Sequence, residues 1–214
     1  MEGSRRLAES GAGPSLKGDR TVEWSFCMAR LADGPGTTLD FGADAGSLSL
    51  AAAQRGHDVL ALDREPCALD YNHEQITFIQ ADILDHRFGG RSFDQVINCS
   101  SVEHVGLAGR YGSSNASEGD LDAMRIMRPL LAPKGRMLLT VPVGRDMVCG
   151  PMHRIYGEGR LPRLLDGYKS IEEQYWRKDL QRGWVRSDRA TALATEGSES
   201  FYALGLFVLG RAEG

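Results

Sequence analysis

The chain has 214 residues, 42% of them hydrophobic, and a formal net charge of −4, which together predict a single globular domain with its own core. The acidic balance argues against nucleic acid as a partner. The chain also lacks the apolar run of about 18 residues that a membrane span needs, so no membrane association is expected.

The first 20 residues are rich in Gly, Ser and charge and show no hydrophobic periodicity. They are expected to form a flexible leader before a domain that covers residues 21–214. The four cysteines (Cys27, Cys67, Cys99 and Cys149) lie far apart in the sequence and form no metal-type pair. We therefore expect no metal site and reduced thiols, and a cytoplasmic location because no signal-peptide core is visible.

The first predicted elements form a strand–turn–helix–strand unit. Residues 22–31 predict a helix, residues 38–42 a strand, residues 47–53 a small-residue helix, and residues 58–62 a second strand that ends in Asp63. Gly42 and Gly46 flank the turn, where they allow a ligand to approach the backbone beside a helix amino terminus. Asp63 follows the turn by about 20 residues, where a carboxylate can accept both ribose hydroxyls. The unit therefore favours a nucleoside cofactor.

The remaining elements continue this alternation. A helix over residues 120–131 is expected, with Asp120 as its cap, and a short helix over residues 160–165. Residues 107–119 and 145–157 are expected to be irregular. Further strands are predicted over residues 76–80, 93–99, 137–141, 170–176, 184–187 and 201–209.

Strands that alternate with helices predict a parallel sheet with right-handed crossovers. Ligands of such sheets bind outside the carboxyl ends of the strands. In this sequence those ends are Gly42–Gly46, Asp63, Asp82, Asn98–His104 and the residues from Val143 onward. The residues with the most distinctive chemistry should therefore meet at one edge.

The runs that carry a family resemblance are Leu39-Asp40-Phe41-Gly42, Gly46, Asp63, Phe78 to Asp82 and Phe93 to Asn98. With them the chain resembles the class I S-adenosylmethionine-dependent methyltransferases. Ser100 to Leu107, Gly119-Asp120-Leu121, Val141 to Gly144 and His153 to Tyr156 make it similar to a small uncharacterised subgroup linked to bacterial polysaccharide or secondary-metabolite synthesis.

The resemblance implies an α/β fold: a Rossmann-like, seven-stranded, mostly parallel sheet with an antiparallel last strand and helices on both faces. It implies S-adenosylmethionine as the cofactor, with Asp63 on the ribose, Asp82 on the adenine amine and Ile83 packed on the ring. It places Asp40 near the cofactor's amino group, although Asp40 could also merely cap a turn. The full set of expected cofactor-binding residues is Asp40, Gly42, Ala43, Asp44, Gly46, Asp63, Asp82, Ile83, Asn98 and Ser100.

One departure from the family pattern lies in the turn, where Asp44 replaces the usual third glycine. Its carboxylate would approach the methionine end of the cofactor. There it could attract the ammonium, repel the carboxylate or mark a lost site. We expect altered but retained binding.

Two histidines are candidates for a catalytic base, because an imidazole can take the proton of an attacking hydroxyl at neutral pH. His153 lies beside Arg154 and Tyr156, which with Tyr111 are expected to bind the substrate. His104 follows the fourth strand, where a purely structural role is an equal alternative. We predict that His153 contributes to turnover and that His104 also supports stability or cofactor binding.

The sequence thus favours a methyltransferase that acts on a small-molecule acceptor, most readily on a hydroxyl of a sugar or secondary metabolite. A catalytically inactive scaffold with the same fold is the alternative. A nicotinamide-dependent oxidoreductase is disfavoured because its fingerprint wants glycine where Asp44 stands. The sequence leaves a homodimer open.

Overall fold

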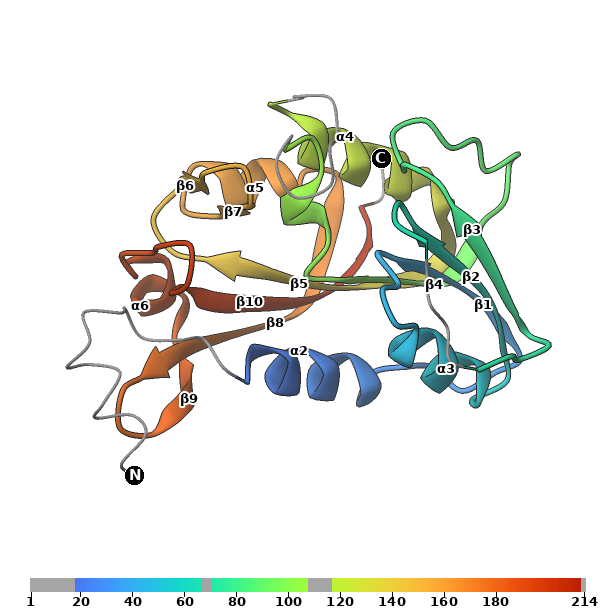
Figure 1. The fold of residues 1–214 in the computed structure, drawn as a ribbon, viewed down its shortest axis with the longest axis horizontal. Coiled ribbons are helices and arrows are strands. Elements are labelled where there is room, and N and C mark those ends of the chain that lie inside the picture. The colour runs from blue at the N-terminus through green and yellow to red at the C-terminus, as the bar shows by residue number, and fades with distance from the viewer. Residues whose placement is uncertain (1–17, 67–70, 108–116, 213–214) are drawn as a thin grey trace.

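A computed structural model describes residues 18–66, 71–107 and 117–212, and its main feature is one eight-stranded sheet (Figure 1). The strands of this sheet are β1 (Gly36–Phe41), β2 (His57–Asp63), β3 (Ile76–Gln80), β4 (Phe93–Cys99), β5 (Leu131–Val143), β8 (Tyr168–Asp179), β9 (Gly183–Ser187) and β10 (Ala203–Arg211). Their order is β3-β2-β1-β4-β5-β10-β8-β9.

The strand directions match the expected topology. The pairs β2–β3, β1–β2, β1–β4 and β4–β5 are parallel, whereas β10 runs antiparallel to both of its neighbours, β5 and β8. This confirms the mostly parallel sheet with an antiparallel last strand. The sheet has one strand more than the expected seven, because β9 pairs antiparallel with β8 at the edge.

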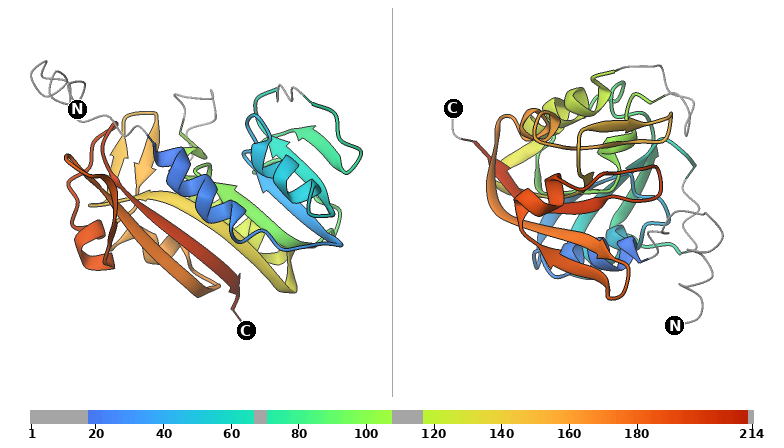
Figure 2. Two further views of the ribbon diagram at one scale, coloured as in Figure 1. Left: turned by 90° about the horizontal axis from the view of Figure 1, so that it is seen from below. Right: turned by 90° about the vertical axis from the view of Figure 1, so that its left-hand side faces the viewer.

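Helices cover both faces of the sheet, as expected (Figures 1 and 2). On one face lie α2 (Asp19–Met28) and α3 (Ser47–Ala53), and on the other lie α4 (Gly119–Met127) and α5 (Arg160–Leu164). Short 3₁₀ turns η1 (Val102–His104) and η2 (Arg128–Leu130) precede and follow α4, and α6 (Arg189–Leu193) precedes β10.

Each face has its own hydrophobic core. Phe26 and Cys27 of α2 and Leu48 and Ala52 of α3 pack with residues of the sheet in one cluster. On the other face, the methionines of α4 are buried among sheet residues, together with Leu161 and Leu164 of α5. The 3.6-residue spacing of these apolar side chains explains why the segments form helices and which side they bury.

Several segments differ from the sequence-based expectation: the helix expected over residues 120–131 ends at Met127, and β5 already begins at Leu131. Residues 145–157, expected to be irregular, contain a hairpin of β6 (Met147–Cys149) and β7 (His153–Ile155). All three residues of β7 are buried, so tertiary packing stabilises strands too short to show a pattern in the sequence. Asp120 is not a helix cap: α4 begins one residue earlier, and the buried Asp120 carboxylate accepts hydrogen bonds from Arg160 and from the Tyr156 hydroxyl.

The amino-terminal helix begins at Asp19, so the last two residues of the expected leader are already helical. The rest of the leader, Cys67 and Tyr111 lie outside the described residues. The three described cysteines are free thiols. Within the described ranges, no cluster of His, Cys, Asp or Glu has a metal-binding arrangement, and no helix has the length and apolar character of a membrane span.

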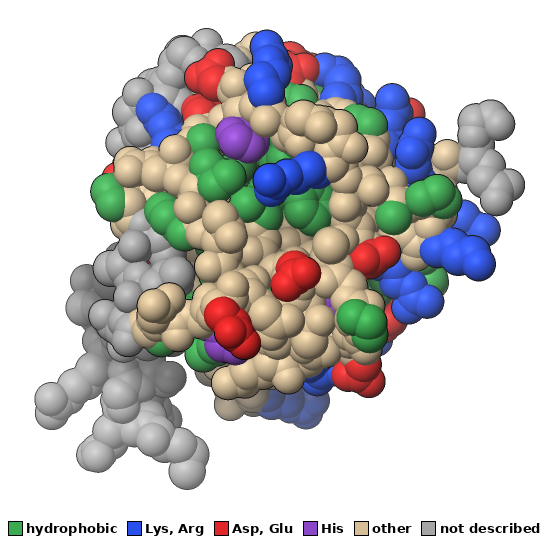
Figure 3. All heavy atoms as spheres, turned by 90° about the vertical axis from the view of Figure 1, so that its right-hand side faces the viewer, with side chains coloured by type: hydrophobic (Ala, Val, Ile, Leu, Met, Phe, Trp, Pro, Cys, Tyr) green, Lys and Arg blue, Asp and Glu red, His purple; other side chains and the backbone are tan. Residues whose placement is uncertain are grey.

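The outer strand β3 is only partly buried at Ile76, Phe78 and Ile79. Figure 3 looks at the molecule from the β3 side and shows hydrophobic side chains near the middle of that face, with charged side chains around and among them. Charged neighbours of this kind discourage an edge strand from pairing with another chain.

Candidate functional site

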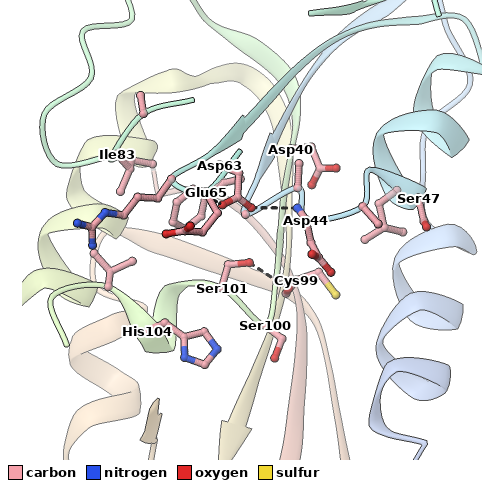
Figure 4. A pocket seen from close by; sticks show the side chains of 18 of the residues that line it. Asp40, Asp44, Ser47, Asp63, Glu65, Ile83, Cys99, Ser100, Ser101 and His104 are labelled. Carbon is pink, nitrogen blue, oxygen red and sulfur yellow. Dashed lines mark hydrogen bonds between the residues drawn. The ribbon is translucent and has the colours of Figure 1, made fainter. Parts of the chain in front are cut away.

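A cavity of about 350 Å³ opens at the carboxyl ends of β1, β2, β3 and β4 (Figure 4). This is the edge at which open α/β sheets bind ligands. The size is also within the range of small-molecule and cofactor sites, about 300–1,000 Å³. Nine of the expected site residues line it: Asp40, Gly42, Ala43, Asp44, Asp63, Asp82, Ile83, Ser100 and His104.

The turn after β1 needs its glycines. Gly42 has a φ of 74°, and a Cβ atom there would overlap Ser101 Oγ, which belongs to the loop after β4. Gly46, with a φ of 70°, occupies the N-cap position of α3. Glycine adopts this left-handed conformation without steric cost. The turn can therefore pass close to the loop after β4 while α3 starts beside the cavity.

Asp44 adopts the glycine conformation although it is not a glycine. Its φ is 47°, a region that Asp tolerates better than most residues. Its backbone N–H donates to Asp63 Oδ2 at 2.9 Å, and its exposed side chain lines the cavity (Figure 4). The replacement of glycine thus preserves the turn and adds a carboxylate to the cavity wall.

Asp63 and Asp82 are placed as acceptors at the ends of neighbouring strands. Asp63 Oδ1 accepts the Glu65 N–H at 2.9 Å, so each Asp63 oxygen holds one backbone donor and keeps a second acceptor position. Asp82 Oδ1 accepts the Leu84 N–H at 2.9 Å, and its Oδ2 lies 3.8 Å from Arg64 Nε. Both carboxylates are fixed in place by the backbone and can accept further hydrogen bonds from a ligand.

Asp40 is buried at the base of the turn. Its Oδ2 accepts the Ser49 hydroxyl at 2.6 Å, which ties β1 to α3. Burial raises the pKa of Asp40 to about 6; the Ser49 hydrogen bond opposes this shift, and the negative charge of Asp63 adds to it. Asp40 therefore combines a structural contact with a place on the cavity wall.

The opposite wall is formed by the loop after β4. Ser100 has a left-handed φ of 52°, and its hydroxyl donates to Glu103 Oε1 at 2.7 Å. His104 Nδ1 lies 2.6 Å from the Met152 carbonyl oxygen. Because a carbonyl only accepts hydrogen bonds, Nδ1 carries the proton of the neutral ring and Nε2 is the nitrogen that can take a proton. The ring of His104 lines the cavity (Figure 4).

The structure does not bring His153 to the cavity. Its side chain belongs to β7, is 8% exposed and packs edge-to-face against the rings of His104 and Tyr202, with centroids 6.2 and 5.4 Å apart. The hairpin of β6 and β7 thus packs against His104 through the ring of His153. Of the two histidines, His104 lines the cavity and His153 does not, whereas the sequence analysis expected both to reach the site.

Gly46 and three other expected site residues also lie outside the cavity lining. Arg154 is buried, 3.5 Å from the Asp120 carboxylate, and donates to the Val105 carbonyl at 2.7 Å. The Tyr156 hydroxyl donates to Asp120 at 3.1 Å, and Asn98 Oδ1 accepts the Val102 N–H at 3.2 Å. Arg154 and Asn98 thus hold the loop that carries His104, whereas Tyr156 contacts Asp120 of α4.

The sequence analysis named no site residue on α2, whose Arg20 and Trp24 line the cavity. Arg20 Nη1 lies 3.1 Å from Glu23 Oε2, and the Arg20 side chain is 45% exposed. Burial raises the pKa of Glu23 to about 7; the charge of Arg20 opposes the shift, and that of Glu103 adds to it. The i,i+3 pair of Arg20 with Glu23, preceded by an acidic first-turn residue, was the available signal for a helix start at this position.

Several solved structures with the same architecture are methyltransferases. The 1,6-didemethyltoxoflavin-N1-methyltransferase of Burkholderia thailandensis, bound to 1,6-didemethyltoxoflavin and S-adenosylhomocysteine, has a TM-score of 0.63 and 15% identity over 97% of this chain and 82% of its own. The N-methyltransferase NodS of Bradyrhizobium japonicum WM9, in complex with S-adenosylhomocysteine, has a TM-score of 0.60 and 16% identity over 91% and 87%. The CcbJ methyltransferase of Streptomyces caelestis has a TM-score of 0.57 and 15% identity over 94% and 92%. These likenesses establish a class I methyltransferase fold.

Residues 45–197 match the model of the family described as Caenorhabditis protein of unknown function, DUF268, so the chain belongs to this family. A comparison with curated protein sequences gave no match.

Proposed function

We propose that this protein transfers a methyl group from S-adenosylmethionine to a small-molecule acceptor, most readily to a hydroxyl of a sugar or secondary metabolite. The observation that carries the proposal is the cavity at the strand ends, in which the glycine turn, Asp63 and Asp82 meet. Structures of the same fold that hold S-adenosylhomocysteine support it.

The residues of the cavity fit this cofactor. Asp63 and Asp82 retain acceptor positions for the ribose hydroxyls and the adenine amine, and Ile83 offers an apolar surface for the ring. The carboxylates of Asp40 and Asp44 suit a ligand with an ammonium and a sulfonium. Arg20, the cation that α2 adds to the wall, would hold the cofactor's carboxylate.

When bound, S-adenosylmethionine would supply an activated methyl group on its sulfonium, and Asp63, Asp82, Ile83 and Arg20 would hold it at the strand ends. His104 takes the proton that the acceptor hydroxyl loses, because its Nδ1 is committed to the Met152 carbonyl and its Nε2 is the basic nitrogen. The imidazolium then returns the proton to water. Walls from α2 and from the loop after β4 hold the acceptor in line, which supplies much of the rate.

A catalytically inactive scaffold with the same fold is the competing function. Asp44 was the reason to consider it, because it replaces a glycine of the cofactor turn. Its backbone keeps the left-handed conformation and its N–H still reaches Asp63. The turn is therefore intact, which favours retained cofactor binding.

Isothermal titration calorimetry of the full chain with S-adenosylmethionine, S-adenosylhomocysteine and NAD tests the proposal. We expect saturable binding of the first two and none of NAD. Absence of binding by both sulfur nucleosides would reject the methyltransferase and leave the scaffold. Binding of NAD alone would indicate an oxidoreductase.

The acceptor is then sought with methyl-labelled cofactor and a panel of hydroxyl and amine compounds. For a hydroxyl acceptor, His104→Ala should lower turnover by roughly 10²–10⁴-fold. His153→Ala is the matched control: it removes the ring behind His104, so a smaller loss is expected. Full turnover of His104→Ala across pH 6 to 9 would show that transfer proceeds without this base, as it could for an amine acceptor.

A further inference from the structure

The loop after β4 contains a buried carboxylate, that of Glu103, which the transfer reaction described above does not use. Glu103 is 1% exposed. Its Oε1 accepts the Ser100 hydroxyl at 2.7 Å and lies 3.7 Å from His104 Nε2. One oxygen therefore faces both the hydroxyl of a left-handed residue at the end of β4 and the basic nitrogen of the histidine in the cavity.

We propose that Glu103 is a positioning residue for His104: its negative charge stabilises the imidazolium that forms when His104 takes the acceptor's proton, and its hydrogen bond holds Ser100 in its left-handed turn. The inference rests on the proposed function for the catalytic role of His104. The contacts among Ser100, Glu103 and His104 stand independently of it.

The two ring nitrogens of His104 have different neighbours. The Met152 carbonyl fixes Nδ1 as the protonated nitrogen, so a proton gained by the ring goes to Nε2, the nitrogen nearer the carboxylate. An opposite charge within about 4–6 Å favours the charged form of a titratable group. Glu103 is thus placed to favour protonation at the atom that general-base catalysis uses.

Other charged and titratable groups pack around Glu103 and His104 and also influence the protonation of His104. Arg20 and Glu23 approach Glu103 from α2, and the His153 ring of β7 lies against His104. Tyr156 and Arg154 adjoin Glu103 from the segment that includes β7. Glu23 has its own donors in Arg20 and Thr140, so Glu103 is the carboxylate committed to His104.

A purely structural Glu103 would do no more than hold Ser100. Glu103→Gln separates the two roles, because the amide oxygen can still accept the Ser100 hydroxyl while the negative charge is lost. Glu23→Gln is the matched control, since it removes a neighbouring buried carboxyl group whose ion pair in the described part of the chain is with Arg20.

The experiment is an NMR titration of histidine-labelled protein, wild type and both variants, without cofactor or acceptor. In Glu103→Gln we expect the midpoint of the His104 titration to fall by about one pH unit, with a clearly smaller change in Glu23→Gln. An unchanged His104 midpoint in folded Glu103→Gln would overturn the proposal, as would an equal shift in the control.

If Glu103→Gln does not fold, Ser100→Ala tests the same contact from the other side. Loss of the hydroxyl removes a hydrogen-bond donor from Glu103 Oε1, the oxygen that lies 3.7 Å from His104 Nε2, so more of its negative charge acts on the ring. The midpoint should therefore rise, and no rise would overturn the proposal. Once an acceptor is known, Glu103→Gln should lower kcat about tenfold or more and leave the cofactor Kd unchanged. The NMR result does not depend on methyl transfer, so failure of this inference and failure of the proposed function are distinguishable.

Discussion

Asp63 provides the most direct test of the cofactor site. The structure shows two backbone N–H groups on its carboxylate, one on each oxygen, from Asp44 and Glu65. Two acceptor positions remain, enough for both ribose hydroxyls. Each charge-assisted hydrogen bond contributes about 1.5–3 kcal/mol, so Asp63→Ala should remove about 3–6 kcal/mol of favourable contacts at most.

The measured loss will be smaller than that upper limit, because water replaces part of the lost contacts. We expect the affinity for S-adenosylhomocysteine to fall at least tenfold by calorimetry, which corresponds to about 1.4 kcal/mol. Asp63 also restrains the glycine turn through the Asp44 N–H, so part of the loss will come from a looser turn.

Asp58→Ala is a matched control, because Asp58 lies on the same strand but is exposed and outside the cavity lining. The affinity of Asp58→Ala for S-adenosylhomocysteine should equal that of the wild type, and circular dichroism should show that both variants are folded. A folded Asp63→Ala protein with unchanged affinity would refute the assignment of the ribose site to the end of β2.

Two further changes test the charges around the turn. Asp44→Gly keeps a residue that tolerates the φ of 47° at this position. It should weaken the binding of S-adenosylmethionine more than that of S-adenosylhomocysteine, especially at low salt, because an acidic wall attracts the positive sulfonium. Calorimetry with both ligands checks this, and tighter binding would mean that Asp44 crowds the cofactor's carboxylate. Glu23→Gln should change the pH dependence of stability. Folding raises the pKa of the buried Glu23 from 4.5 to about 7, so the group is neutral in both the folded and the unfolded protein below about pH 4.5. As the pH rises from there through 7, the unfolded protein ionises more readily, and the folded state loses stability on the order of 3 kcal/mol in total. Urea unfolding of both proteins from pH 4.5 to 8 should therefore show Glu23→Gln gaining on the wild type, and parallel curves would contradict the shift.

Short-range patterns in the sequence were sufficient for much of the framework. The expected bounds of α3, β3 and β4 agree with the structure, because apolar periodicity and flanking turn residues are local properties of the chain. The glycine turn and the acids Asp63 and Asp82 could be placed at one edge for the same reason, since parallel strands present their carboxyl ends together.

The contacts that complete the site depend on residues far apart in the sequence. The pairing of β8 with β9, the hairpin of β6 and β7, and the approach of Arg20 to the cavity arise from packing between distant segments. The sequence predicted strands at β8 and β9 but not their pairing, whereas the three-residue strands β6 and β7 and the helix start in a polar leader show no strong periodicity and could not be predicted.

The roles of the two histidines show the same division. Both follow strands or strand ends in the sequence, and their residue type alone makes both chemically able to accept a proton. Only the tertiary structure places them differently with respect to the cavity. His153 is buried in β7 against the ring of His104, whereas His104 lines the cavity with its Nδ1 next to the Met152 carbonyl. The sequence by itself determined the sheet edge and its acids through local periodicity, whereas long-range packing decided which imidazole reaches the cavity.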